Sequence, residues 1–149
     1  MNLSSSLEAS RRQIRNQLDY FDQELISFLD HYIPQDAHRR SKVEQTLRVY
    51  TSVLEDLLEN LTLSSLHSVV LIGSKIALYD MNDKTSEFFM IVLPHDADPD
   101  MNKISFLSPL GFQLLMARKG EAYNLETPSG IMRVRVDDIQ LLHDEEMEL

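Results

Sequence analysis

Two carboxylates flank a bend that we predict between two long helices. Asp30 and Asp36 lie on either side of Pro34. Carboxylate oxygens that converge on one point can hold Mg²⁺, and bound Mg²⁺ can activate water. Asp36 also stands where the second helix would begin, and there an Asp side chain caps free backbone N–H groups. We favour the capping role over a metal site and keep Asp30 and Asp36 as catalytic candidates.

A second acidic segment carries Asp at alternate positions, as an EF-hand loop does at its start. It reads His95-Asp96-Ala97-Asp98-Pro99-Asp100. The positions that an EF-hand fills with Gly and Glu hold Met101 and Leu107, and Pro99 restricts the backbone. We therefore expect no calcium site here and interpret the segment as an exposed loop with a docking role.

The remaining reactive residue types indicate no further catalytic or metal site. The chain has no cysteine, which excludes disulfides, thiolate ligands and cysteine nucleophiles. His31 and His38 could approach each other across the bend, but two ligands do not make a zinc site. Ser108 lies outside any Gly-x-Ser-x-Gly context, so we interpret it as a helix cap rather than a nucleophile.

The first 62 residues carry apolar residues in steps of three and four, the spacing of a coiled-coil seam. The repeat comprises Leu7, Ile14, Leu18, Phe21, Leu25, Phe28 and Tyr32, then Val43, Leu47, Tyr50, Leu54, Leu57 and Leu61. Pro34 ends the first helix, and so short a connection makes the two helices antiparallel. Folding about this bend brings Asp22 opposite Arg48, and it brings a basic group opposite an acidic one. These groups are Arg11, Arg12 and Arg15, and Glu55, Asp56 and Glu59.

The second half changes to the alternation of strands. We expect strands over residues 75–80, 85–93, 103–107, 121–127 and 131–142, with a helix that starts at Ser108-Pro109 and runs to Ala117. This order predicts an α+β fold, with one helix packed on a small antiparallel sheet. The predicted organisation is a helical hairpin over 1–62, a linker over 63–68, a C-terminal domain over 69–142 and an acidic tail over 143–149.

Composition limits the classes of partner. The net charge of -10 opposes direct binding to DNA, which relies on clustered Lys and Arg. It favours a protein partner with a basic or mixed surface. The first residues lack the apolar core of a secretion signal and no apolar run is long enough to span a bilayer, so we expect a cytoplasmic protein with no membrane contact.

Five elements in the second half occur in a characteristic order. They are Asp96-Ala97-Asp98, Ile104-Ser105, Ser108-Pro109, Gly120-Glu121 and Pro128-Ser129-Gly130. With these, residues 69–142 resemble the C-terminal domain of the GreA/GreB transcription factors. The resemblance implies an FKBP-like fold without prolyl isomerase activity. It also implies docking at the secondary channel of bacterial RNA polymerase, for which we single out Asp96, Asp98, Ser108 and Pro109.

The resemblance also implies that the hairpin enters the channel, where family members use an acidic pair at its tip to hold a catalytic Mg²⁺. Their motif, of the type Gly-Asp-Leu-x-Glu-Asn-Ala-Glu-Tyr, is replaced here by a tip that runs from Asp30 to His38. The shorter hairpin and altered tip resemble the Rnk-type relatives, which are regulators of nucleoside diphosphate kinase and occupy the polymerase site without cleaving. We therefore expect a regulator that is not an enzyme and needs no cofactor.

Two alternatives remain open. One is a true cleavage factor that uses the tip carboxylates with Mg²⁺, and the other is an interaction module for another target, such as a kinase. A basic cluster near the tip, Arg39, Arg40 and Lys42, could contact RNA or an acidic channel wall, or could form a solvated helix face. The sequence does not determine the oligomeric state.

Overall fold

The computed structural model describes residues 3–142. The chain divides into two compact units, Met1–Thr62 and Leu63–Leu149, and each is described by itself. The acidic tail expected over 143–149 lies outside the described residues.

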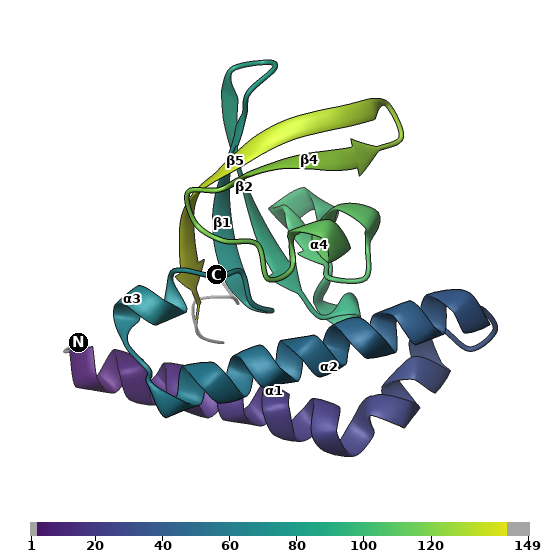
Figure 1. The fold of residues 1–149 in the computed structure, drawn as a ribbon, viewed down its shortest axis with the longest axis vertical. Helices are drawn as coiled ribbons and strands as arrows, with labels where there is room; N and C mark the ends of the chain where they lie inside the picture. Colours follow the sequence, from purple (N-terminus) through teal and green to yellow (C-terminus); the bar gives the residue numbers. More distant parts are fainter. Residues whose placement is uncertain (1–2, 143–149) are drawn as a thin grey trace. The chain divides into compact units, whose positions relative to one another are not determined.

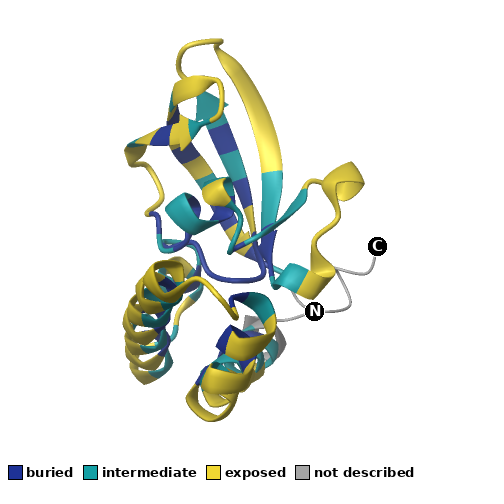
Figure 2. Cartoon of the chain, turned by 90° about the vertical axis from the view of Figure 1, so that its right-hand side faces the viewer, coloured by how far each residue is buried: buried dark blue, intermediate teal, exposed yellow. Residues whose placement is uncertain are grey.

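The first unit is a hairpin of two helices, α1 (Leu3–Tyr32) and α2 (Ala37–Glu59) (Figure 1). The predicted seam is confirmed at its main positions, which are buried on both helices; Figure 2 colours the buried parts of the two helices dark blue. These buried residues are Ile14, Phe21 and Phe28 on α1, and Val43, Leu47, Tyr50, Leu54 and Leu57 on α2. Leu29 and Ile33, which the repeat leaves out, are also buried near the bend.

Aromatic packing and one hydrogen bond strengthen this seam. The Phe21 ring meets the rings of Phe28 and Tyr50 edge to face, with centroids 5.7 and 6.3 Å apart. The Tyr50 hydroxyl donates a hydrogen bond of 2.6 Å to Oε1 of Gln17. Aromatic pairs of this geometry stabilise by about 0.5–1.5 kcal/mol beyond their burial, so the half of the hairpin nearer the bend is firmly held.

The ion pairs within the hairpin differ from the predicted ones. Arg11 pairs with Glu8 at 3.5 Å and Arg48 with Glu44 at 3.4 Å, each inside its own helix. Among the residues whose side chains are described, 7–142, no ion pair joins the basic and acidic groups predicted to face each other across the hairpin. Long side chains easily reach a partner one turn away on the same helix, which explains why the ion pairs form within each helix rather than between the two.

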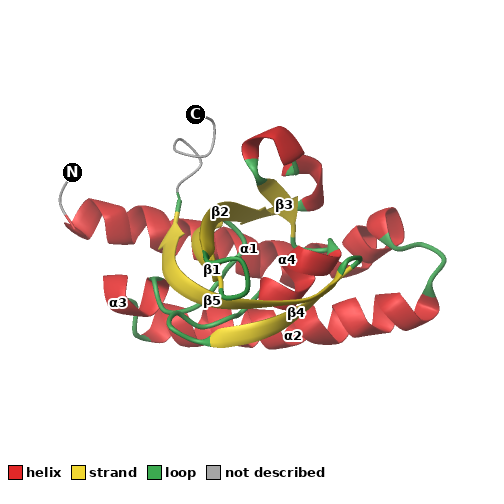
Figure 3. Ribbon diagram, turned by 90° about the horizontal axis from the view of Figure 1, so that it is seen from above, coloured by secondary structure: helices red, strands yellow, loops and turns green. Residues whose placement is uncertain are grey.

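Over residues 63–142, the described part of the second unit, the chain forms a five-stranded sheet, two short helices and two 3₁₀ turns. Its elements are α3 (Leu63–Leu66), β1 (Ser74–Asp80), β2 (Thr85–Val92), η1 (Pro94–Asp96), η2 (Pro99–Met101), β3 (Lys103–Ser105), α4 (Pro109–Leu114), β4 (Ala122–Thr127) and β5 (Gly130–Leu141). The strand order is β3-β2-β1-β5-β4, and Figure 3 shows the curved course of β5 with β4 beside it. Helix α4 contacts β3 and β4.

The core of this unit lies on one face of the sheet. Alternate residues of β1 and β5 are buried there, and so are Phe106, which directly follows β3, and Leu114 of α4. The buried strand residues are Ile76 and Leu78 on β1, Ile91 on β2, Leu125 on β4, and Val134, Val136 and Ile139 on β5. The alternation predicted from sequence is therefore present in β1 and β5.

Three expectations need correction. The predicted linker 63–68 contains the one-turn helix α3, whose Leu66 is buried. The sheet is mixed, because β2 and β3 are parallel. A tight hairpin would make them antiparallel, but the connection over residues 93–102 folds into two 3₁₀ turns. It carries the chain back along β2, so that β3 begins beside Met90 and runs in the same direction as β2.

The predicted helix at 108–117 is also shorter than expected. Helix α4 ends at Leu114, and Met116 adopts a positive φ of 67°. The backbone there bonds to the buried segment 69–72 instead: Met116 N donates to Val70 O, and Val70 N donates to Ala117 O, both at 2.8 Å. Pairing with a distant segment thus replaces the last helical turn.

Candidate functional site

The tip of the hairpin (residues 30–38) holds the two carboxylates that could bind a metal. Asp30, at the end of α1, accepts an ion-paired contact of 2.8 Å from Nη2 of Arg40, near the start of α2. The Asp30 side chain is two-thirds exposed, whereas that of Arg40 is largely covered. The carboxylate therefore ties the end of α1 to the start of α2, a role that the sequence did not suggest.

Asp36 performs the capping role predicted for it. Its backbone is extended, with φ -111° and ψ 91°, and its Oδ1 accepts a hydrogen bond of 3.0 Å from the Arg39 backbone N–H. Its own carbonyl accepts from Arg40 N at 2.8 Å. These are the contacts of a helix N-cap, so Asp36 and Asp30 each have a partner within the hairpin. Within the described residues, no group of three or more His, Asp or Glu side chains could hold a metal ion.

The basic cluster is divided by this arrangement. Arg40 faces Asp30 across the bend, while Arg39 and Lys42 lie on the exposed surface of the first turns of α2. Arg39 also supplies the backbone N–H that Asp36 caps. Arg39 and Lys42 thus lie apart from the Asp30–Arg40 ion pair.

The acidic loop is shaped by its own aspartates. Asp98 caps η2, with its Oδ1 accepting from Asp100 N at 3.2 Å, and its backbone pairs with Lys103 through bonds of 2.9 and 3.0 Å. Asp96 ends η1 and pairs with the neighbouring His95 at 3.5 Å between Oδ2 and Nε2. Both residues are exposed, so the loop offers negative charge next to β3.

Ser108 and Pro109 lie at the other end of β3. The Ser108 Oγ accepts from Gly111 N at 3.1 Å, as a cap does, and donates to Ser105 O at 2.7 Å. The Ser105 Oγ in turn accepts from Leu107 N at 3.0 Å. Pro109 occupies the first helical position, where its missing N–H costs nothing, and it is exposed. Because β3 has three residues, the structure brings the acidic loop and the Ser-Pro turn to opposite ends of a strand about 10 Å long.

Two residues that sequence reasoning did not single out fix this turn. Gly111 passes so close to Ser105 that a Cβ placed on it would lie 2.1 Å from the Ser105 carbonyl oxygen. The Gln113 side chain donates to Pro109 O at 2.9 Å and to Glu126 O at 3.0 Å, and accepts from Glu126 N at 2.8 Å. It therefore fastens α4 to the edge strand β4. The sequence offers no pattern from which the role of Gln113 could be read, since the contact spans thirteen residues.

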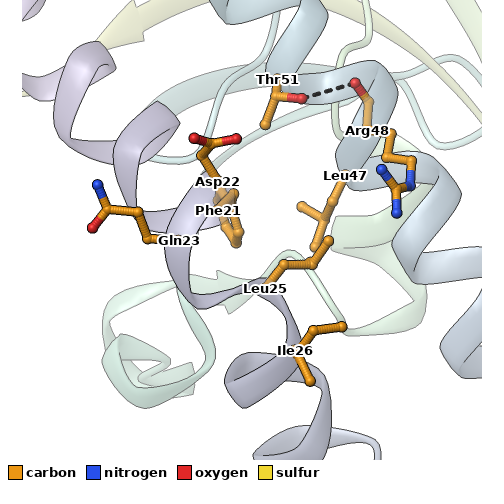
Figure 4. Close-up of a pocket in the computed structure, with 8 residues that line it drawn as sticks. All are labelled: Phe21, Asp22, Gln23, Leu25, Ile26, Leu47, Arg48 and Thr51. Atoms are coloured by element: carbon orange, nitrogen blue, oxygen red, sulfur yellow. Dashed lines mark hydrogen bonds between the residues drawn. The ribbon is translucent and has the colours of Figure 1, made fainter.

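A hollow of about 270 Å³ opens between α1 and α2 (Figure 4). Its walls are apolar at Leu25, Ile26 and Leu47, with Asp22 and Arg48 at its margin. Asp22 and Arg48 thus line one hollow from opposite helices, as the predicted hairpin register requires, although Arg48 is paired with Glu44. The hollow brings together no set of groups for acid–base or nucleophilic chemistry.

No helix among the described residues has both the length and the apolar character needed to cross a membrane.

Two solved structures align with this chain. The GreA factor homolog 1 (Gfh1) of Thermus thermophilus aligns over 93% of this chain and 92% of its own, with 24% identity and a TM-score of 0.46. A GreA/GreB elongation factor from Nitrosomonas europaea aligns over 70% of this chain and 93% of its own, with 25% identity and a TM-score of 0.46.

Sequence relatives match about half of this chain. Transcription elongation factor GreA of Thermosipho africanus is 31% identical over 74 residues, which cover 50% of this chain and 47% of the relative. That of Thermoanaerobacter pseudethanolicus is 35% identical over 71 residues, covering 48% and 45%. The chain thus matches about half the length of these relatives.

The family model described as "Transcription elongation factor, GreA/GreB, C-term" matches residues 65–141. This range contains both the acidic loop and the Ser-Pro turn on either side of β3. It is more than half of the chain, and it agrees with the resemblance drawn from the five ordered motifs. The chain therefore belongs to the GreA/GreB transcription elongation factor family.

Proposed function

We propose that this protein binds bacterial RNA polymerase and regulates transcription elongation without stimulating transcript cleavage. Its C-terminal domain docks at the rim of the secondary channel, and its hairpin occupies the channel. The observation that carries the proposal is the engagement of both tip carboxylates, Asp30 with Arg40 and Asp36 with the first turn of α2.

Docking is supported by the rigidity of the surface that surrounds β3. The Ser108 cap, the close approach of Gly111 and the Gln113 clamp hold Pro109 in place at the surface. Asp96 and Asp98 are exposed in the loop that leads into β3, at the end of the strand opposite Ser108 and Pro109. A preorganised surface loses little side-chain freedom on binding, which suits a docking site of modest size.

The absence of cleavage is supported by the chemistry of the tip. Holding Mg²⁺ requires carboxylate oxygens that converge on one point. Here Asp30 would have to leave Arg40, and Asp36 would have to leave the helix terminus that it caps.

The first experiment combines a binding assay on purified RNA polymerase with transcript cleavage on a backtracked complex. We expect saturable binding, competition with a GreA-type cleavage factor and no shortening of the RNA. Pro109→Ala should weaken binding because it alters an exposed docking side chain while Ser108 still caps α4. Pro128→Ala is the matched control, since Pro128 is an exposed proline in the β4–β5 turn of the same domain.

Other outcomes would point to the two alternatives. Mg²⁺-dependent cleavage that disappears in Asp30→Asn would make the protein a cleavage factor and overturn the non-cleaving role. Failure to bind polymerase would sink the proposal as a whole and favour another protein target, such as nucleoside diphosphate kinase.

A further inference from the structure

One exposed side of the hairpin carries an apolar hollow with charged side chains along both of its walls. Asp22 and Ile26 of α1 and Arg48 of α2 line the hollow described above (Figure 4). Residues seven apart in a helix lie on the same side of it, so Arg15 shares the side of Asp22, and Glu55 shares the side of Arg48. All five residues are exposed. We call them the hollowed face.

The two helices place opposite charges level with each other on this face. Asp22 and Arg48 line one hollow from opposite helices, so they lie at the same level along the hairpin. Arg15 precedes Asp22 by seven residues and Glu55 follows Arg48 by seven. Because antiparallel helices advance by the same rise per residue in opposite directions, Arg15 is level with Glu55. At both levels, therefore, the cation and the anion stand on different helices.

Most of these charges are not used within the chain. Among residues 7–142, Arg15, Asp22 and Glu55 take part in no ion pair. Arg48 contacts Glu44 of its own helix at 3.4 Å, and an exposed pair of this kind is worth less than about 1 kcal/mol. It can be exchanged for a better partner at little cost.

This arrangement of charges is complementary to itself. Half a turn about an axis parallel to the hairpin exchanges the positions of α1 and α2 and brings a second copy face to face with the first. Arg15 of each copy then lies over Glu55 of the other, and Asp22 lies over Arg48. Such an interface is isologous, since each contact occurs once on either side of the axis. Another kind of partner would have to supply the same alternation of charges at the same spacing.

We propose that the hollowed face binds a second copy of this chain, so that two hairpins form a four-helix bundle. Neighbouring helices in this bundle are all antiparallel, as in bundles with short loops. Ile26, whose side chain is 59% exposed, packs against the hollow of the other copy and covers its apolar walls at Leu25 and Leu47.

The hairpin has enough surface for this contact. Helix α2 has 23 residues and is therefore about 35 Å long, and two packed helices are roughly 20 Å wide. The resulting face of roughly 700 Å² per copy is close to the ~800 Å² that each partner contributes to a standard interface. The net charge of -10 opposes self-association, so we expect a weak dimer with a dissociation constant on the order of 10 µM.

The inference does not rest on the proposed function. If the hairpin also enters the polymerase channel, the two copies must separate first, so self-association and polymerase binding compete. The test below contains no polymerase, so its outcome is independent of whether the chain binds polymerase.

The test is sedimentation equilibrium of the full chain at concentrations from roughly 1 to 300 µM, which span the expected dissociation constant. Asp22→Arg and Arg48→Asp should each weaken dimerisation at least about tenfold, because each brings like charges together between the copies. An equimolar mixture of the two variants should regain most of the lost affinity, since each chain then offers the charge that the other needs. Rescue between two different chains cannot arise from a contact within one chain.

Glu24→Arg is the matched control. It makes the same change of charge on α1, but Glu24 is two residues from Asp22, so its exposed side chain points away from the hollowed face. This variant should not weaken dimerisation. Circular dichroism checks that each variant is folded, and Arg48→Asp against the unaltered chain carries the test if Asp22→Arg is not.

Three results would overturn the proposal. The first is a chain that remains monomeric up to roughly 300 µM, which would leave the face to another protein. The second is an equal weakening in Glu24→Arg, which would assign the effect to net charge. The third is a mixture of Asp22→Arg and Arg48→Asp that associates no more tightly than either variant alone.

Discussion

Asp30 and Asp36 carry the side chain that Mg²⁺ prefers, yet each is held by a neighbour within the hairpin. Arg40 pairs with Asp30, and the first turn of α2 supplies the N–H group that Asp36 accepts. The residue type alone therefore does not define a metal site; the direction of each carboxylate does. The same reasoning applies to Ser108, whose hydroxyl is used by Ser105 and Gly111 and not by any base.

The capping role of Asp36 can be separated from a metal-binding role by two substitutions. Asp36→Ala should lower the free energy of unfolding by about 1 kcal/mol, because an orphan helix N–H loses its acceptor. Asp36→Asn should retain most of the stability, since Asn caps equally well but ligates Mg²⁺ poorly. Chemical denaturation followed by circular dichroism measures both. Two results together would contradict the capping role: a large loss of stability in Asp36→Asn, and a change in the stability of the unaltered protein when Mg²⁺ is added.

The pair of Arg135 and Asp137 makes a prediction about pH. The hydrogen bond from Arg135, aided by its charge, lowers the pKa of the Asp137 carboxyl below the ordinary 3.8. A carboxyl with a lowered folded-state pKa stabilises the fold above its unfolded-state pKa, and this contribution is lost as pH falls through the folded-state value. A carbon-detected NMR titration should find the low pKa, and Arg135→Gln should return it toward 3.8. An unchanged Asp137 titration in Arg135→Gln would refute the assignment. The pair is exposed, so its effect on stability is small.

At the scale of elements, β3 and α4 position the acidic loop and the Ser-Pro turn at the surface of the second unit. β3 joins the acidic loop to the Ser-Pro turn, and Gln113 fastens α4 to β4. The coiled-coil pattern located the two hairpin helices well, because heptad spacing is a local property of each helix. The parallel β3 and the early end of α4 escaped prediction, because each depends on hydrogen bonds to residues far away in the chain.

Gly111 tests this arrangement directly. In most helices Gly→Ala stabilises by up to about 1 kcal/mol. Here Gly111→Ala places a Cβ 2.1 Å from the Ser105 carbonyl oxygen, so the backbone must shift, and we expect a loss of about 1–3 kcal/mol in the free energy of unfolding. Thermal or urea denaturation measures it. A gain in stability would mean that the close approach of α4 to β3 is not as described.

At the scale of the whole molecule, the net charge of -10 is the property that bears on association. If the protein docks on a basic or mixed surface of polymerase, long-range attraction increases the rate of encounter. Stopped-flow or biosensor measurements should then show an association rate that falls severalfold between about 0.05 and 0.3 M salt, as the Debye length shortens. The dissociation rate should change less. A salt-independent association rate would show that the acidic charge has no steering role.

The sequence by itself determined the helical hairpin, the change to strand periodicity, the Ser108 and Asp36 caps, and membership of the family. These rest on patterns within one helix turn, one strand or one ordered set of motifs, and such patterns are legible along the chain. Only the tertiary structure decided the partners of Asp30 and Gln113 and the parallel pairing of β3. Each of these is a contact between separate segments, whose geometry depends on how the strands and helices are brought together.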